Sequence, residues 1–120
     1  VVGRSDYRPA FVPSGSSIQA LPGLRKTSFG SAQGINDHGQ MVGLDDYQRA
    51  GGRTTFERRA VLWPDAESVI DLNKSVTLNA GDTLESAYRI NNAGLILGTG
   101  HFPTVSELGS LAYLLIPRGL

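Results

Sequence analysis

The pattern that decides the fold occurs twice, as SAQGINDHGQMVG at Ser31–Gly43 and as SAYRINNAGLILG at Ser86–Gly98. The two stretches align without a gap at an offset of 55 residues. In each, a short segment is followed by Asn-Asp or Asn-Asn, one further residue, a glycine and an apolar segment. Asn or Asp at the start and glycine at the end suit a type I turn that closes with a left-handed glycine between antiparallel strands. The same β-hairpin is therefore predicted twice.

An apolar segment that ends in proline recurs as well. AVLWP at Ala60–Pro64 is followed by SVIDL at Ser68–Leu72. The same order occurs 51 residues earlier, where AFVP at Ala10–Pro13, one residue shorter, precedes SIQAL at Ser17–Leu21, and AYLLIP at Ala112–Pro117 repeats the apolar part. Proline has no backbone N–H to donate, so it ends strand pairing. The central unit is thus predicted to contain four short strands, over residues 32–36, 39–44, 59–63 and 68–72.

The recurrence divides the 120 residues into one complete unit, 31–85, between two partial units, 1–30 and 86–120. Side chains alternate between the two faces of a strand, and in residues 39–44 and 59–63 both faces are largely apolar. We therefore expect a sheet that is covered on both sides. Four strands per unit and a period near 50 residues are typical of propeller blades. The sequence predicts a single all-β domain, a propeller-like array of four-stranded antiparallel repeats.

The composition narrows the class of protein. Fifteen Gly and six Pro are more turn formers than a helix bundle would tolerate. Eleven Lys and Arg balance eleven Asp and Glu, so no net field would draw the chain to nucleic acid or to an anionic membrane. The absence of Cys excludes a disulfide framework, a zinc-thiolate site and a thiol nucleophile. No apolar run reaches the roughly 18 residues that a membrane-spanning helix needs.

The recurring residues resemble the probable extracellular repeats of bacteria that are named HAF after a His-Ala-Phe signature. The resemblance covers nearly the whole chain and is carried by turn and strand residues, namely Ile35–Asp37, Met41–Gly43, Ala60–Trp63 and Asp71–Leu72. The His of the signature is replaced by Pro9, Arg59 and Leu111, and its Phe by Val61 or Tyr113. The resemblance implies an exported protein, extracellular or in the cell envelope, with a propeller-like fold. It implies no catalytic residue and no cofactor.

With so few units, some strand edges of the predicted sheets would have no partner within the chain. The chain holds fewer than three units, whereas a propeller usually has at least four blades. Exposed edge strands invite pairing with another chain. We therefore expect the chain to be a fragment of a longer protein, as its start at Val1 without Met also indicates, or to close a ring by self-association.

A local concentration of positive charge lies in the Gly-rich stretch 48–59, which contains Arg49, Arg53, Phe56 and Arg58. Arg with interleaved aromatic side chains can bind anionic sugars through stacking and bidentate hydrogen bonds. The stretch is also the longest break inside the complete unit, and such loops often carry the binding sites of repeat proteins. These four residues are the predicted ligand-binding residues. The alternative is a solvated loop, whose charges are balanced by neighbouring carboxylates.

Other polar and aromatic residues are predicted to be structural. His38 and His101 have no partners at the spacing of metal ligands, so we expect them in exposed turns or loops. Asp45–Tyr47 supplies paired carboxylates that could hold calcium or act as acid and base, but the helix-loop-helix calcium pattern is absent and a solvated loop is expected. Polar residues in the connection 73–85 are expected to bond their own backbone. The residues expected in the core are Trp63, Tyr88 and Tyr113.

The sequence lacks the Gly-x-Ser-x-Gly nucleophile elbow and a phosphate-binding glycine loop that leads into a helix. It therefore predicts a non-catalytic extracellular structural or binding module, with no predicted cofactor or metal. Two alternatives stay open: a carbohydrate-binding or glycoconjugate-binding module that uses the loop 48–59, and a fragment of a propeller-type hydrolase. The expected partners are like repeats, a glycan or a protein ligand, and neither nucleic acid nor membrane insertion is expected.

Overall fold

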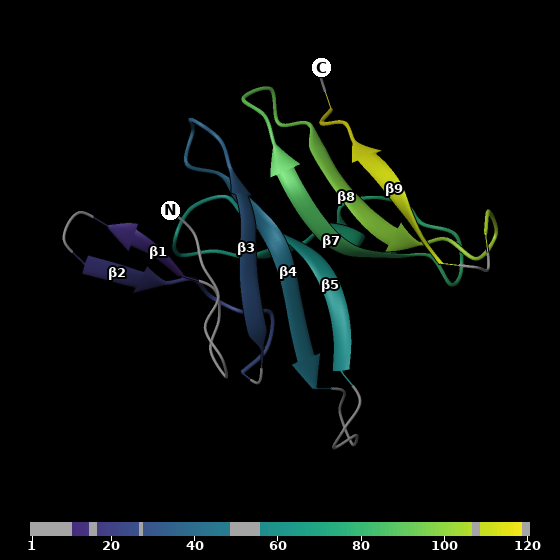
Figure 1. Cartoon of the computed structure of the whole chain (residues 1–120), viewed down its shortest axis with the longest axis horizontal. Helices are drawn as coiled ribbons and strands as arrows, with labels where there is room; N and C mark the ends of the chain where they lie inside the picture. Colours follow the sequence, from purple (N-terminus) through teal and green to yellow (C-terminus); the bar gives the residue numbers. More distant parts are fainter. Residues whose placement is uncertain (1–10, 15–16, 27, 49–55, 107–108, 119–120) are drawn as a thin grey trace.

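The computed structural model describes residues 11–14, 17–26, 28–48, 56–106 and 109–118 (Figure 1). Within them the chain forms β-strands and one short 3-10 helix, η1 (Leu72–Lys74). The strands are β1 (Phe11–Ser14), β2 (Ser17–Ala20), β3 (Phe29–Ile35), β4 (Met41–Gln48), β5 (Phe56–Trp63), β6 (Ile70–Asp71), β7 (Thr83–Ile90), β8 (Ile96–His101) and β9 (Ser110–Leu115). All described strand pairs are antiparallel, which confirms the predicted all-β class. No helix in the described ranges has the length and apolar character needed to cross a membrane.

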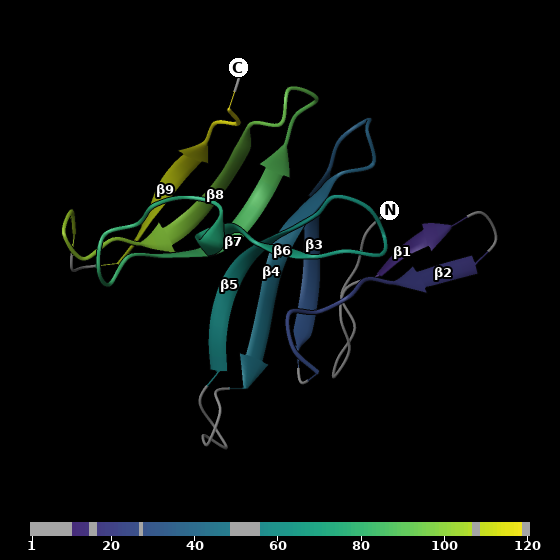
Figure 2. The same cartoon turned by 180° about the vertical axis from the view of Figure 1, so that it is seen from behind.

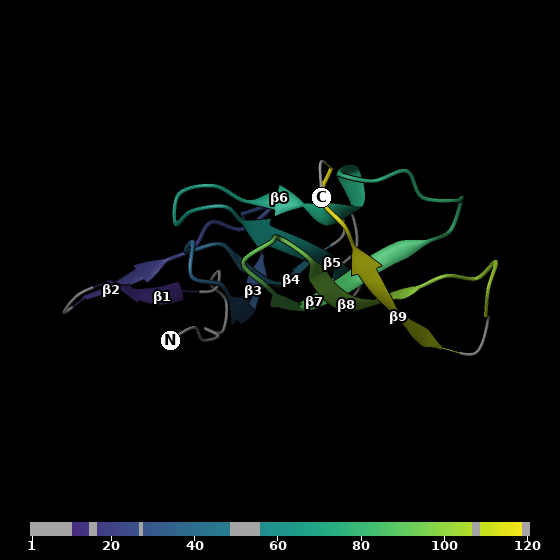
Figure 3. The same ribbon diagram turned by 90° about the horizontal axis from the view of Figure 1, so that it is seen from above.

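Three sheets follow one another along the chain. Sheet A consists of β1 and β2, sheet B has the order β3-β4-β5-β6, and sheet C has the order β7-β8-β9. Figures 1 and 2 show sheet B between sheets A and C. Seen from above, β6 and η1 lie on one side of this row (Figure 3). The four strands predicted between residues 32 and 72 are the four strands of sheet B, with different bounds.

The two predicted hairpin turns have the same geometry. Gly39 N donates to Asn36 O at 3.1 Å, and Gly94 N donates to Asn91 O at 3.0 Å. Gly39 has a φ of 78° and Gly94 a φ of 87°, a left-handed conformation that glycine adopts without a Cβ clash. The local sequence is therefore sufficient to reverse the chain at both places.

Sheet C packs with one of its faces on sheet B. The buried side chains of this contact form one apolar cluster, made of Val42, Ala60, Leu72, Leu84, Ala87, Ile90 and Ile96. Burial of apolar surface contributes roughly 25 cal/mol per Å² and holds the two sheets together. The strands β3 and β7 also approach closely at Gly34, where a Cβ would lie 2.6 Å from Tyr88 O. A larger residue at position 34 would push the two sheets apart.

The opposite face of sheet B is covered by the segment that precedes β3. A second buried cluster contains Leu21, Ala32, Met41, Val61 and Trp63. Trp63 is fully buried, and its Nε1 donates to Pro22 O at 2.8 Å, so the indole has no unpaired donor. The prediction that this sheet is covered on both sides is confirmed for sheet B.

The strands β4 and β5 are longer than predicted. Asp45, Asp46 and Tyr47 lie within β4, so the prediction of a solvated loop there is wrong. The reason lies in the register, which places Asp46 opposite Arg58 on β5. Cross-strand pairs of opposite charge stabilise antiparallel pairing, so a polar sequence can extend the hairpin.

Candidate functional site

One face of sheet C is turned away from sheet B and carries exposed large side chains. We call it the outer face of sheet C and define it by Tyr88 and Arg89 of β7, Leu97 of β8, and Ala112 and Leu114 of β9. Tyr88 is 44% exposed, and Leu97 and Leu114 are each 50% exposed. Their neighbours along β8 and β9 pack on sheet B, because side chains alternate along a strand. Clustered exposed apolar side chains are typical of an interaction surface.

A groove of about 660 Å³ runs along this face. One wall is formed by the outer face of sheet C, and the other by residues 33–35 of β3. Ile35 adds a side chain that is 46% exposed, while Gln33, Arg89 and Asn91 add polar groups. Apolar side chains with polar groups around them are typical of surfaces that bind a partner through apolar contact and hydrogen bonds.

Two tyrosines lie on opposite faces of sheet C. The Tyr88 hydroxyl is 3.4 Å from Thr99 Oγ1, and this hydrogen bond is the largest of the effects that lower the pKa of Tyr88. Tyr113 packs against the buried cluster, where its hydroxyl donates to Ser86 O at 2.7 Å and burial raises its pKa. Tyr113 is therefore a neutral, structural phenol, whereas the ring of Tyr88 is available for contact.

The core positions predicted for Trp63 and Tyr113 are confirmed, but the one predicted for Tyr88 is wrong. A register shift between Ala87 and Arg89 leaves Tyr88 as an extra residue in the ladder. Such a bulge changes the direction in which the side chain points. The sequence did hold a signal, because Tyr88 aligns with the polar residue Gln33, which lies at the matching register shift of β3 and is exposed.

Of the predicted ligand-binding residues, the structure describes the side chain of Arg58. Its guanidinium forms two hydrogen bonds to Asp46, from Nε to Oδ1 at 2.7 Å and from Nη2 to Oδ2 at 2.8 Å. The hydrogen bond to Asp46 is the largest effect that raises the pKa of Arg58. Arg49 and Arg53 lie outside the described residues, as does the side chain of Phe56, whose backbone begins β5. Ligand binding by these four residues stays a prediction.

The two neighbouring carboxylates of β4 point to opposite faces of the sheet. Asp46 faces Arg58, whereas Asp45 is fully buried and its Oδ2 accepts a hydrogen bond from Leu24 N at 2.6 Å. Burial raises the pKa of Asp45, and the hydrogen bonds from Leu24 N and the Ser28 hydroxyl oppose this shift. Carboxylates on opposite faces cannot share a calcium ion or act together as acid and base.

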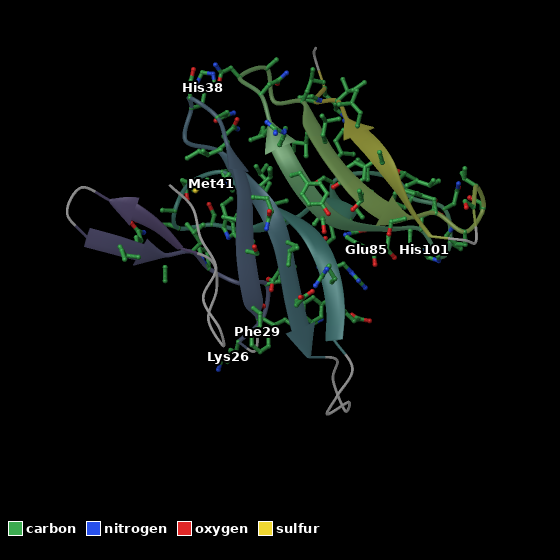
Figure 4. The ribbon with its side chains drawn as sticks, in the orientation of Figure 1. Lys26, Phe29, His38, Met41, Glu85 and His101 are labelled. Carbon is green, nitrogen blue, oxygen red and sulfur yellow. The ribbon has the colours of Figure 1, made fainter. Side chains whose placement is uncertain are left out.

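The two histidines belong to separate places in the fold. His38 lies in the exposed turn between β3 and β4, as predicted, and His101 is the last residue of β8 (Figure 4). The prediction that His101 lies in a loop is therefore wrong, because this residue ends a strand. Among the described residues, no group of three or more His, Cys, Asp and Glu side chains is arranged to hold a metal ion.

The prediction that polar residues of 73–85 bond their own backbone is confirmed for Asn73, which lies in η1 and holds the start of β7. Asn73 Nδ2 donates to Leu84 O at 2.9 Å, and Leu84 N donates to Asn73 Oδ1 at 2.7 Å. The Asp71 side chain accepts from Asn73 N and caps η1. These hydrogen bonds hold the backbone in place, so their polar groups have a structural role. The outer face of sheet C is therefore the candidate functional site.

Comparisons of the chain with models of protein families, with curated proteins and with solved structures find no match. The resemblance to HAF repeats therefore stays a prediction, and the function is argued below from the geometry.

Proposed function

We propose that this chain is a non-catalytic structural module whose sheets are copies of one repeat, stacked in a propeller-like order. Extracellular or cell-envelope placement belongs to the same proposal and rests on the resemblance to HAF repeats. The observation that carries the proposal is that sheet B packs on the residue that follows sheet A, and sheet C packs on the residue that follows sheet B, through side chains at corresponding positions.

The corresponding residues are clearest at the leucine that follows the last strand of a unit. Leu21 follows β2 and packs in one cluster with Ala32 and Met41 of sheet B. Leu72 follows β6 at an offset of 51 residues and packs in one cluster with Ala87 and Ile96 of sheet C. Ala87 and Ile96 are the residues that align, at an offset of 55 residues, with Ala32 and Met41. One unit thus covers the next in the same way at both contacts.

The strand registers support the same correspondence. Val42 pairs with Leu62 in sheet B, and Leu97 pairs with Leu114 in sheet C. The register shift in the first hairpin lies between Ala32 and Gly34, and one shift in the second lies at the aligned positions of β7. Equal registers place aligned residues on equal faces, because the side-chain period of a strand is two.

The hairpin turns of sheets B and C also bond to each other. Asn36 Nδ2 donates to Asn91 O at 3.0 Å, and Asp37 N donates to Asn92 Oδ1 at 2.8 Å. Asn92 Nδ2 donates in return to Asp37 Oδ2 at 2.8 Å. These bonds join residues that align at an offset of 55 residues, as expected when successive copies of one unit stack in register.

Matched truncations test the repeat. Leu21→Ala and Leu72→Ala remove corresponding side chains from the two buried clusters, so we expect each to lower the free energy of unfolding by a similar amount, about 2 to 4 kcal/mol. Urea denaturation followed by circular dichroism measures both, with Val105→Ala as a control because Val105 is 75% exposed. A large loss at one leucine and none at the other would contradict equivalent contacts.

A substrate panel tests the non-catalytic role. We expect no turnover of generic ester, phosphate and glycoside substrates by the purified chain. Hydrolysis of any of them above the level of a mock purification would overturn the proposal in favour of a hydrolase. Saturable glycan binding that is lost in Arg53→Ala and Phe56→Ala would favour the carbohydrate-binding alternative.

A further inference from the structure

The last strand of sheet C has an open edge. β9 pairs with β8 on one side, and in the described part of the chain no strand pairs with its other side (Figure 1). In sheet B a fourth strand, β6, pairs with β5 and places Ile70 opposite Leu62. Leu62 aligns with Leu114 of β9. An edge strand presents unpaired backbone N–H and C=O groups, so β9 offers a template for one more strand.

A second groove, of about 430 Å³, adjoins this edge strand. We call it the η1 groove and define it by Leu72 and Ser75 at η1, by Ile96 of β8 and by Leu115 and Ile116 at the end of β9. Ile116 is 63% exposed. The groove is therefore largely apolar and open to a partner.

Four residues of the η1 groove correspond to residues that form the buried cluster around Trp63 or pack against it. The corresponding pairs are Leu72 with Leu21, Ser75 with Leu24, Ile96 with Met41, and Leu115 with Trp63. The strand registers agree, since Ile96 lies opposite Leu115 in sheet C as Met41 lies opposite Trp63 in sheet B. The η1 groove is thus the counterpart in sheet C of a place that is buried in sheet B.

Sheet B shows which side chains occupy that place. Ala66 and Val69, from the segment that leads from β5 into β6, pack against the cluster around Trp63. In sheet C, none of the described residues after Pro117 takes their positions. The groove and the open edge of β9 therefore lack the same element, the segment that corresponds to residues 64–72.

We propose that the η1 groove and the edge of β9 bind an extended segment of a partner polypeptide, which adds a fourth strand to sheet C. The segment has the chemistry of residues 64–72: a small and a β-branched apolar residue, three positions apart, fill the groove as Ala66 and Val69 do in sheet B. The residues after them pair with β9, where main-chain hydrogen bonds give affinity and the groove gives specificity. Arg118 also lines the groove, and its charge suits a segment with carboxylates.

This proposal rests on the proposed function, because it uses the correspondence between sheets B and C. Fluorescence anisotropy of a labelled synthetic peptide with the sequence of residues 64–72 measures its binding to the whole chain. We expect saturable binding. Val69→Asp in the peptide places a charge in the groove and should weaken binding about tenfold or more. A peptide of the same residues in scrambled order is the control and should not bind.

Variants of the chain test the groove itself. Ile116→Asp and Val76→Asp each add a charge at an exposed residue that lines it, so each should keep the fold and weaken binding of the unchanged peptide about tenfold or more. Val105→Asp is the matched control, since Val105 is exposed and lies outside the groove. Circular dichroism should show the same β-sheet signal in all three. Unchanged binding by either groove variant would overturn the proposal.

Hydrogen exchange shows where the peptide lies. An added strand protects the backbone amides of β9 that point to its open edge, so their exchange should slow when the peptide is bound. Slower exchange elsewhere, with none in β9, would mean that the peptide binds another strand, for example in place of β6, and would overturn the proposal.

Two further outcomes would also overturn it. One is the absence of saturable binding at peptide concentrations up to about 1 mM. The other is a dimer of the 12.8 kDa chain that the peptide dissociates, seen by light scattering, because a second copy would then occupy the site. The proposed function fails separately, through hydrolysis or through unequal effects of Leu21→Ala and Leu72→Ala. Absence of peptide binding with equal effects of those truncations overturns the strand site alone.

Discussion

In sheet B, Val42 and Ala60 are fully buried, whereas the residues at the corresponding places of sheet C, Leu97 and Ala112, are exposed. The strands around them have the same pairing, since Val42 faces Leu62 as Leu97 faces Leu114. The difference therefore comes from the neighbours: sheet B is covered by sheet C on one face and by the segment before β3 on the other, whereas sheet C has a described neighbour on one side. A strand pattern determines which residues share a face, but only a second layer buries that face.

Sheet B also differs from sheet C in the polar end of its second strand. Asp45 and Asp46 stand where sheet C has Gly100 and His101. Asp45 binds Leu24 N and so attaches the segment before β3 to sheet B. Sheet C has Gly100 at the corresponding position and therefore lacks this carboxylate, so the attachment through Asp45 is specific to sheet B.

The largest loss of stability is expected at Val42, the buried residue in the comparison of Val42 with Leu97. Val42→Asp places a charge in the cluster between sheets B and C, and an unpaired buried charge costs several kcal/mol, about 3 to 5 by analogy with broken buried ion pairs. Leu97→Asp at the exposed corresponding position should change the free energy of unfolding by less than about 1 kcal/mol. Urea denaturation at low protein concentration measures both without a contribution from association. Equal losses would show that the outer face of sheet C is covered within one chain.

The second expected effect concerns the pH dependence that Asp45 confers on sheet B. Because burial raises its pKa above the ordinary 3.8, the folded chain holds this proton more tightly than the unfolded chain does. The favourable contribution is complete below about pH 4 and is lost as the pH rises through the raised pKa. Asp45→Asn should remove this loss of stability. Thermal unfolding of both chains between about pH 3 and pH 8 measures it.

Asp65→Asn is the control for this measurement. The pKa of the exposed Asp65 is lowered, first by the hydrogen bond from Glu67 N and then by that from the Ser68 hydroxyl. Its contribution therefore has the opposite sign and is lost as the pH falls. A pH profile that Asp45→Asn leaves unchanged would mean that this carboxyl titrates alike in the folded and unfolded chains.

A smaller effect is expected at the turns that connect sheets B and C. Asn92→Ala removes both bonds to Asp37, and an exposed hydrogen bond contributes about 0.5 to 1.5 kcal/mol, so we expect a loss of about 1 kcal/mol. The exposed neighbour offers the control Ala93→Ser, which should leave stability unchanged. Hydrogen exchange of the Asp37 amide should accelerate in Asn92→Ala, and an unchanged rate would argue against the bond between the turns.

The smallest effect is expected at the ion pair between Arg58 and Asp46. The arginine side chain is 48% exposed, so Arg58→Ala should cost about 0 to 1 kcal/mol, and less at high salt. Arg89→Ala on the outer face of sheet C is the control. Denaturation in low and high salt measures the difference, and a loss at Arg58 that salt does not reduce would point to packing of its aliphatic stem.

The sequence was a sufficient guide where the structure is local. Gly39 and Gly94 reverse the chain because of turn chemistry within a few residues, so both hairpins were predictable. The strand bounds were less predictable, because β4 continues through Asp45 and Asp46 where these residues pair with β5. The candidate site was not predicted, because the exposure of Tyr88 depends on a bulge.

By itself, the sequence determined the antiparallel hairpins, the sharing of faces along each strand and the core position of Trp63, because turn chemistry and side-chain alternation act within a strand pair. Only the tertiary structure decided that Asp45 is buried, that Tyr88 is exposed and that sheet C keeps an open outer face. These outcomes depend on which distant segments meet. Leu24 reaches Asp45 across 21 residues, and burial follows from such long-range neighbours rather than from the pattern of one strand.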